Sequence, residues 1–365
     1  MAIGQGYRSK CVAAKETTFR TAVDCTDLIP FTDESFFDER VQLQSDVLTG
    51  KAGRRFQDIG NLIVTGSLSA DLAYDKLASA QFFGTDLLIS AAMGGVQVYA
   101  NDYLQMRLSE TMDCFLTICI ARRPEDAGVQ EFTSCFCKSM TISGSAGQPI
   151  KIATEWVAFD VTRTGQENTW AEVDAVATGE VLKRVLFNQG NFMLGDLTNV
   201  LVTGTDEVAI SDFTFTLNNN VSDPEYATDD IDALSVPGKM LLPVRAGKRD
   251  VTLEITRARH PDDTFFGTAY SAGTAFQGQL SFTGGATWNW DLYMPYMIIE
   301  KPETNISGAN PLTEKITFRC LRGTDYNAGA GNTVMLVDPV TQVQVCTEEF
   351  AINTENERTA VIISA

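Results

Sequence analysis

Alternation of apolar and polar side chains with a period of two is the feature that most restricts how this chain can fold. Val251, Leu253 and Ile255 stand on one side of a segment whose other side carries threonine and glutamate. Residues 210–217 and 64–72 show the same pattern, with phenylalanine or leucine opposite serine and threonine. Successive side chains of a strand point to opposite faces, so the pattern indicates antiparallel strands with one buried face. We therefore expect a mainly β protein.

Helical periodicity is sparse in this chain. Leucine and alanine at helical spacing within residues 71–83 predict one helix of about three turns that ends at Gly84. Residues 172–187 predict a weaker helix, because Gly179 lies inside it. One or two short helices are thus expected beside many strands.

Two short motifs recur in the same order in the two halves of the chain. Phe-Phe-Gly-Thr occupies 82–85 and again 265–268, each time after a strongly alternating segment. Ile-Ser-Gly occupies 142–144 and again 306–308, each time before a further predicted strand. A length of 365 residues also fits two domains at roughly 150 residues each. The order of motifs predicts two related β-sandwich or barrel domains, each with a short flanking helix.

The predicted domains divide the chain into three parts. Residues 1–170 form the first domain, with an N-terminal arm and a long loop at 45–60. Residues 171–335 form the second, with a long loop at 218–247, and residues 336–365 form a C-terminal extension of open function. The change in spacing between the two motifs places an insertion at 87–101 in the first domain.

Few residues with catalytic chemistry are present. His260 is the single histidine, and we interpret it as a strand-end residue, because no serine or cysteine elbow accompanies it. The eight cysteines include Cys135 and Cys137, but a zinc site needs a second pair or further histidines. We expect buried, reduced thiols rather than disulfides. The sequence predicts no catalytic residue, no cofactor and no metal site, and hence no enzyme.

The charge balance restricts the partners of the chain. Lys and Arg total 28 and Asp and Glu total 47, so the formal net charge is −19. Binding nucleic acid tightly requires clusters of Lys and Arg, whereas an acidic wall lets DNA slide past. The longest nearly uncharged apolar stretch, 87–100, is shorter than the roughly 20 residues of a membrane helix. The N-terminus has no apolar signal segment, so we expect an unexported chain that does not enter a membrane.

A long polar connection precedes the strongest strand of each predicted domain. The first, 45–60, carries a local basic cluster of Lys51, Arg54 and Arg55 in an otherwise acidic chain. The second, 218–247, carries a local acidic cluster. Long connections of this kind are usually functional or disordered. Opposite charges on two loops indicate contacts between identical neighbouring chains, although two solvated loops would carry the same charges.

Taken in order, these segments resemble the tail tube proteins of long-tailed bacteriophages, in the branch where one chain carries two tube domains. The resemblance covers about residues 1–325 and rests on the segments 16–19, 28–35, 43–50, 60–72, 210–217, 247–257 and 292–295. It implies a small β-barrel or sandwich with a flanking helix, stacked rings, and a long loop that reaches a neighbouring ring. The contact candidates that follow are Asp46, Leu48, Lys51, Arg54, Arg55, Phe56, Asp223, Glu225, Asp229, Asp230 and Arg245.

The resemblance also implies how copies assemble. Exposed strand edges present unpaired N–H and C=O groups, and neighbouring subunits in a ring can pair them edge to edge. Two similar domains per chain predict a trimeric ring with pseudo-sixfold symmetry, and head-to-tail stacking of rings gives a tube. The lumen is expected to be polar and acidic, so that viral double-stranded DNA passes without specific binding. Tape-measure and tail-end proteins are the other expected partners, in a virion tail assembled in the host cytoplasm.

Two alternative functions remain open at this stage. One is a tail-end, terminator or secretion-tube ring protein, which would stop at one ring instead of forming a tube. The other is a β-sandwich carbohydrate-binding or hydrolytic module that uses tryptophans as sugar platforms and a carboxylate pair for acid–base work. The tryptophans it would use are Trp156, Trp170, Trp288 and Trp290.

Overall fold

The protein is mainly β, as the alternation predicts, and it is described here by a computed structural model. The described residues are 9–44, 57–74, 84–100, 103–111, 113–122, 128–176, 183–197, 201–222, 243–258, 264–285, 288–305, 312–323 and 348–355.

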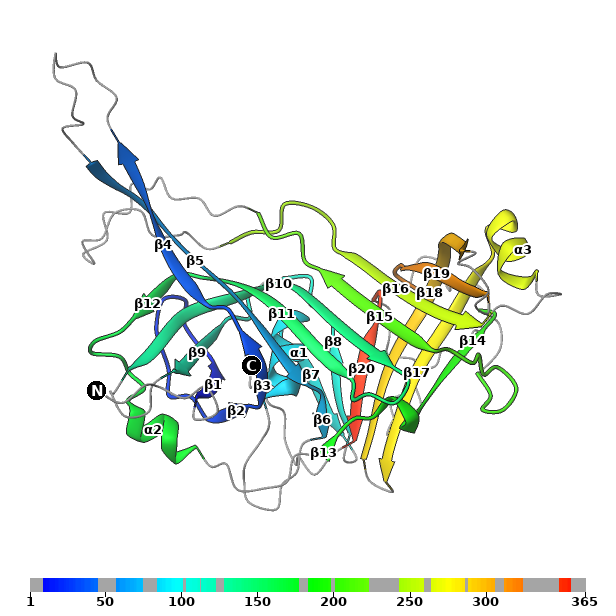
Figure 1. Cartoon of the computed structure of the whole chain (residues 1–365), viewed down its shortest axis with the longest axis horizontal. Coiled ribbons are helices and arrows are strands. Elements are labelled where there is room, and N and C mark those ends of the chain that lie inside the picture. Colours follow the sequence, from blue (N-terminus) through cyan, green and yellow to red (C-terminus); the bar gives the residue numbers. More distant parts are fainter. Residues whose placement is uncertain are drawn as a thin grey trace, which may run out of the picture.

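Figure 1 shows long strands with a few short helices beside them. The strands are β1 (Lys10–Lys15), β2 (Asp27–Ile29), β3 (Phe31–Glu34), β4 (Phe37–Gln44), β5 (Gln57–Asp71), β6 (Ala73–Tyr74), β7 (Val96–Ala100), β8 (Tyr103–Arg107), β9 (Leu116–Ala121), β10 (Val129–Ser145), β11 (Lys151–Ala158), β12 (Asp160–Thr162), β13 (Lys183–Arg184), β14 (Gly190–Gly195), β15 (Asp212–Asn218), β16 (Asp250–Ala258), β17 (Ala275–Gly285), β18 (Trp288–Asn305), β19 (Thr313–Cys320) and β20 (Ala351–Glu355). The helices are α1 (Thr85–Ala92), α2 (Trp170–Ala175), the 3₁₀ helix η2 (Phe187–Gln189) and α3 (Phe265–Ala272).

One long antiparallel sheet runs across the molecule. Its strands pair in the order β4, β5, β11, β10, β15, β16, β19 and β18. Figure 1 shows β4 and β18 at opposite ends of this sheet. The chain therefore presents two different sheet ends, one from its N-terminal part and one from its C-terminal part.

The two faces of this sheet differ as the alternation requires. Every second side chain is buried along β15, β16 and β19, so that Phe215, Leu253 and Phe318 lie in the core. Trp156 in β11 belongs to the same core cluster. The other face carries mostly Ser and Thr with scattered charges. Burial of about 25 cal/mol per Å² of apolar surface stabilises the sheet on the core face alone, which leaves the polar face for solvent or a partner.

The pairing order repeats within the chain. The strands β4, β5, β11, β10, β9 and β1 pair successively, and we call them the first strand set. The strands β15, β16, β19, β18, β17 and β14 pair in the same way and form the second strand set. Both sets place a helix after their second strand, and α1 packs on β10 as α3 packs on β18. The repeat predicted from short motifs thus has a counterpart in the order of pairing.

Even the irregularities correspond between the sets. In the first set, β10 has a bulge between Cys137 and Ser139 where it pairs with β11. In the second set, β18 has a bulge between Ile299 and Lys301 where it pairs with β19. A bulge shifts the register by one residue, so the matching position fixes which residues of the two sets correspond.

A strand near the C-terminus connects the second set to the hairpin of β7 and β8. The strand β20 pairs with β18 on one side and with β8 on the other. The hairpin of β7 and β8 follows α1 and has no counterpart after α3. The short strands β2, β3 and β12 pair with β1, β5 and β10, whereas β6 and β13 form a separate two-stranded sheet.

The predicted helix at 71–83 is wrong over the residues that are described. Asp71 ends the strand β5, Ala73 and Tyr74 form β6, and 75–83 lie outside the described residues. Gly84, expected to end a helix, instead precedes α1 as its N-cap. The helix lies in the uncharged stretch that we assigned to an insertion. It lacks a polar face because all its residues are buried, which hides helical periodicity in the sequence.

The weaker helix predicted at 172–187 is mostly wrong. α2 ends at Ala175. The capping box of Thr169 and Glu172 lies at the other end of the helix and stabilises only its first turn. Lys183 and Arg184 form the short strand β13 instead. The capping box therefore marks where α2 begins, and the helix ends after six residues.

Candidate assembly interface

The two strand sets join through one pair of strands, β10 and β15. Their register runs from Ser139 opposite Asn218 to Ser145 opposite Asp212. Beyond the strand end, the Asn219 amide donates to the Lys138 carbonyl at 2.9 Å. This join makes one continuous sheet from two sets, with the same ladder that holds strands together inside each set.

The join also covers α1. Asn219, which follows β15, donates from Nδ2 to the Ala92 carbonyl at the end of α1 (2.9 Å) and to the Cys137 carbonyl (3.1 Å). Thr354 of β20 donates to Asp86 at 3.4 Å. All residues of α1 are buried.

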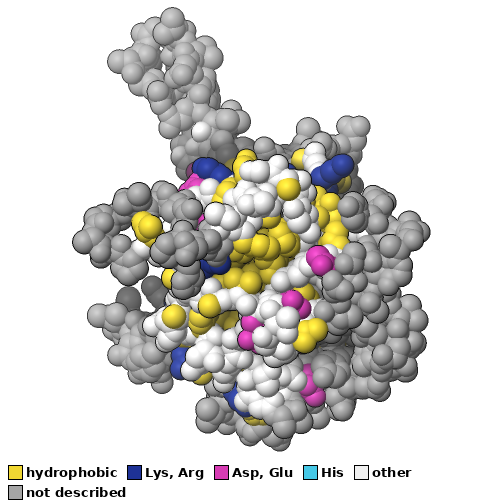
Figure 2. Space-filling view, turned by 90° about the vertical axis from the view of Figure 1, so that its right-hand side faces the viewer, with side chains coloured by type: hydrophobic (Ala, Val, Ile, Leu, Met, Phe, Trp, Pro, Cys, Tyr) yellow, Lys and Arg dark blue, Asp and Glu magenta, His cyan; other side chains and the backbone are white. Residues whose placement is uncertain are grey.

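The corresponding end of the second set is uncovered. The pairing of β17 with β18 stops where Ala275 lies opposite Ile298. From Ile299 to Asn305, β18 pairs with β19 on one side, and no described strand pairs with its other side. In α3 only Phe266 and Ala269 are buried, while Phe265 and Tyr270 are 53% and 48% exposed. Figure 2 looks onto this side of the molecule and shows hydrophobic side chains gathered around a hollow.

A cavity of about 370 Å³ opens between β14, β15 and β17 of the second set. Phe187, Phe192, Phe213, Leu280 and Phe282 line it, with Glu207 at its polar part.

The other open edge is that of β4. Its pairing with β5 is recorded along Phe37–Gln44, and no described strand lies on its outer side. Ser35 donates its N–H to the Ser67 carbonyl (3.0 Å), so the backbone groups of Asp38 and Arg40, which have the other parity, point away from β5. Phe37 is 51% exposed.

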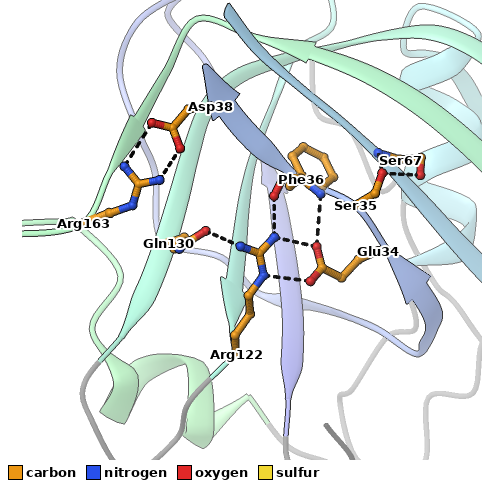
Figure 3. A network of polar contacts seen from close by, with 8 residues as sticks. All are labelled: Glu34, Ser35, Phe36, Asp38, Ser67, Arg122, Gln130 and Arg163. Carbon is orange, nitrogen blue, oxygen red and sulfur yellow. Dashed lines mark hydrogen bonds and ion pairs between the residues drawn. The ribbon is translucent and has the colours of Figure 1, made fainter. Parts of the chain in front are cut away.

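An arginine network covers the start of this edge (Figure 3). Arg122 donates from Nε and Nη2 to the two carboxylate oxygens of Glu34, both at 2.7 Å, and from Nη1 to Gln130 at 2.7 Å. Arg122 also donates to the Phe36 carbonyl, and the Phe36 N–H donates to Glu34 at 3.1 Å. Both outward backbone groups of Phe36 are therefore satisfied by side chains, which leaves the edge open only from Phe37 onward.

The same network fixes two carboxylates in their charged form. Burial raises the pKa of Glu34, but the hydrogen bonds and charge of Arg122 outweigh it, and the pKa is lowered overall. Hydrogen bonds from Arg163 are the main cause of the lowered pKa of Asp38 in β4. Figure 3 shows these ion pairs tying β3 and β4 to the segments that follow β9 and β12. The edge strand is thus held in place by charges that persist at neutral pH.

Comparison with known proteins assigns this architecture to a family. The family described as phage tail tube protein matches residues 6–320. The chain belongs to the phage tail tube protein family. It is accordingly a structural component of a virion tail, and the family is not an enzyme class.

A solved structure of the SPP1 tail tube, determined by solid-state NMR and cryo-EM, is also similar to this chain. It is 12% identical, covers 37% of this chain and 74% of its own, and has a TM-score of 0.27. At this level of overlap the structural likeness carries no argument of its own. No curated protein matches the chain.

Most contact candidates predicted from the sequence lie outside the described residues. These are Asp46, Leu48, Lys51, Arg54, Arg55 and Phe56 in the first loop and Asp223, Glu225, Asp229 and Asp230 in the second. Arg245 is described: it forms a β-bridge with Val221, and its guanidinium donates to the Glu110 carbonyl at 3.3 Å. Burial lowers its pKa, with the nearby charge of Arg249 as a further cause. The role of all these predicted candidates in contacts between tube subunits stays a prediction.

The sequence reasoning did not single out Phe37, Arg122 or the end of β18. A signal was present for Phe37, because Phe36 and Phe37 are adjacent and a strand with one buried face cannot bury both. Arg122 gave no local signal, because its partners Glu34 and Gln130 come from other strands.

Other predicted chemistry has the following outcome. The seven described cysteines are free and buried. Burial raises the pKa of the two that lie in β10, Cys135 and Cys137. His260 and Cys346 lie outside the described residues. Within the described part of the chain, no group of His, Cys, Asp and Glu is arranged to hold a metal, and no helix has the length and hydropathy to span a membrane.

The carbohydrate-binding alternative loses two of its four tryptophan platforms. Trp156 and Trp290 are each 1% exposed, so neither ring can stack on a sugar. Trp288 lies against Tyr74 and the Lys183 ammonium, which is 3.1 Å from the centre of the indole ring. These tryptophans pack within the protein.

Proposed function

We propose that this chain forms the tail tube by closing into trimeric, pseudo-sixfold rings that stack head to tail. The observation that carries the proposal is the long sheet built from two alike strand sets, already joined edge to edge by β10 and β15. In this proposal the two strand sets are the two predicted domains, 1–170 and 171–335, and the predicted extension 336–365 contributes β20, which pairs with β18. A sheet with unlike open ends extends by adding copies until the rotation between them closes a ring.

The polar face of the sheet would line the lumen in such a ring. It carries small hydroxyl side chains such as Thr141, Thr216 and Thr252, next to charged groups. Lysines also occur on this face, but Lys315 pairs with Glu254 at 2.7 Å and Lys301 pairs with Glu303. Paired lysines contribute little net attraction for phosphate, so DNA would pass this surface without specific binding.

The long loops at 45–60 and 218–247 would then contact the next ring, with tape-measure and tail-end proteins as further partners. Assembly would take place in the host cytoplasm. A tail-end ring protein of similar architecture remains the second candidate, since the same open ends would serve a single ring.

Negative-stain electron microscopy of the purified full chain tests the proposal. We expect hollow rods with a regular axial repeat. Single rings that do not stack would favour the tail-end alternative, and a persistent monomer at high concentration would contradict both.

A further inference from the structure

The chain contains its own template for the contact between copies. Inside the chain, β15 pairs with β10 just beyond the bulge of β10. The corresponding position on β18, just beyond its own bulge, has no described strand beside it. The strand that corresponds to β15 is β4, whose outer edge is likewise open.

Corresponding residues follow from the registers. Ser139 and Lys301 are the first paired residues after the two bulges. Trp156 and Phe318 pair with the last residues before the bulges, and they lie opposite Gly66 and Leu253 respectively.

Ile63 lies three residues before Gly66 in β5, and Asp250 lies three residues before Leu253 in β16. Glu39 lies opposite Ile63, and Asn218 lies opposite Asp250. Glu39 of β4 therefore corresponds to Asn218 of β15, and Arg40 corresponds to Asn219.

We propose that β4 of one copy adds antiparallel to the open edge of β18 in the next copy, with Glu39 opposite Lys301. This register reproduces the pair of Ser139 and Asn218 inside the chain. It also places Arg40 opposite Glu300. The corresponding residues inside the chain are Asn219 and Lys138, where the Asn219 amide donates to the Lys138 carbonyl. The inference rests on the proposed self-assembly and specifies the surface that performs it.

Charge favours this pairing of edges. Glu39 and Lys301 are exposed and have opposite charges, as do Arg40 and Glu300, although Lys301 also pairs with Glu303 and Glu300 with Arg319 inside one chain. Inside the chain the first of these positions holds a neutral pair, Ser139 and Asn218. Opposite charges directly across an antiparallel pair stabilise it, and they select the correct edge among several.

The two edges also limit where pairing can occur. The Arg122 network satisfies the outward groups of Phe36, so pairing starts after it. Pro302, which would lie opposite Asp38, has no N–H to donate and is typical of an edge strand. The contact is therefore shorter than that of β10 and β15, which protects the free chain from indiscriminate edge pairing.

The same placement of a second copy on β18 also accounts for the exposed side chains of α3. In the first set, Asn219, the residue after β15, contacts the end of α1 through the Ala92 carbonyl. A second copy placed on β18 in the same way would cover the exposed side chains of α3, including Tyr270.

Engineered disulfides test the register. In the template, the Lys138–Asn219 pair is hydrogen-bonded, so Ser139 and Asn218 form a non-hydrogen-bonded pair, with Cα atoms about 4.5 Å apart. That spacing lies within the range of about 4.4–6.8 Å that a disulfide requires. The double variant Glu39→Cys with Lys301→Cys should give a covalent trimer under mild oxidation. A mixture of the two single variants should give covalent dimers.

Matched controls are available in the same chain. Ser139→Cys with Asn218→Cys tests the template position and should close within one chain. Glu39→Cys with Lys315→Cys places the second cysteine one strand further in, on β19, and should not link copies. The unsubstituted chain, whose seven described cysteines are buried, reports any background linkage.

Hydrogen exchange of the unsubstituted chain provides a readout that needs no variant. The amides of Asp38 and Arg40 should exchange at least about tenfold more slowly in rings than in monomers. Rings or tubes without this linkage and protection would overturn the register and leave the proposed function standing. Absence of rings, tubes and linkage would overturn both, whereas linked trimers that never stack would retain the register and contradict the tube.

Discussion

The helices α1 and α3 hold corresponding places in the two strand sets but have different surroundings. All of α1 is buried beneath β20 and the residue after β15, whereas α3 buries only Phe266 and Ala269. The edges beside them differ in the same way, because β15 occupies the edge of β10 and no described strand occupies that of β18. The difference indicates that the second set lacks what the first obtains from its neighbour in the chain.

The largest expected effect is a difference in the free energy of unfolding between a variant in α1 and a variant in α3. Leu88→Ala in α1 should lower the free energy of unfolding by about 2–5 kcal/mol, because it removes a fully buried side chain. Tyr270→Ala in α3 should change it by less than about 0.5 kcal/mol in the monomer, because the ring is half exposed. Urea unfolding of monomeric protein measures both. Equal losses in the two variants would remove the contrast on which the comparison rests.

The next prediction concerns how the free edge is held. In β15 the backbone of Phe215 pairs with Ile142, whereas just before β4 the backbone of Phe36 is bound by Arg122 and Glu34. Arg122→Met should lower the free energy of unfolding by about 1–3 kcal/mol, since it leaves Glu34 without its charged partner. Arg163→Met removes a more exposed pair and should cost at most about 1 kcal/mol. If urea unfolding gives the reverse order, the network does not hold the edge.

Acid should weaken the same edge. The pKa values of Glu34 and Asp38 are lowered in the folded chain from ordinary values of 4.5 and 3.8. Their contribution to stability is therefore complete above these ordinary values and is lost as the pH falls through the lowered ones. Unfolding measured from pH 7 downward should show a smaller acid-induced loss in Arg122→Met than in the unsubstituted chain. Parallel pH profiles would contradict this assignment.

The smallest expected effect is a charge exchange across the proposed contact. Glu39→Lys should weaken association by about 0.2–1 kcal/mol, roughly 1.4- to 5-fold, since exposed ion pairs contribute little. Adding Lys301→Glu should restore association, which sedimentation at low salt would measure. Failure of the double exchange to recover would speak against this pair of residues.

Much of the fold was predictable because it depends on local periodicity. The strands around Phe215, Leu253 and Val64 followed from alternation, since a half-buried strand must place its apolar residues at every second position. The motif Phe-Phe-Gly-Thr lies at the start of α3 at Phe265, and the last residue of its first copy, Thr85, begins α1. That the two copies mark two related domains stays a prediction. The position of α1 was not predictable, since a helix buried on all sides loses the polar face that identifies it.

The amino-acid sequence by itself determined the class of fold and the family to which the chain belongs. Only the tertiary structure decided which edges are paired and which are open, because pairing between strands far apart in the chain depends on register and not on local pattern. Arg122 shows the same limit, since its partners Glu34 and Gln130 approach it only when separate strands are packed together. Periodicity describes one strand at a time, whereas an assembly surface is formed by strands that the sequence keeps apart.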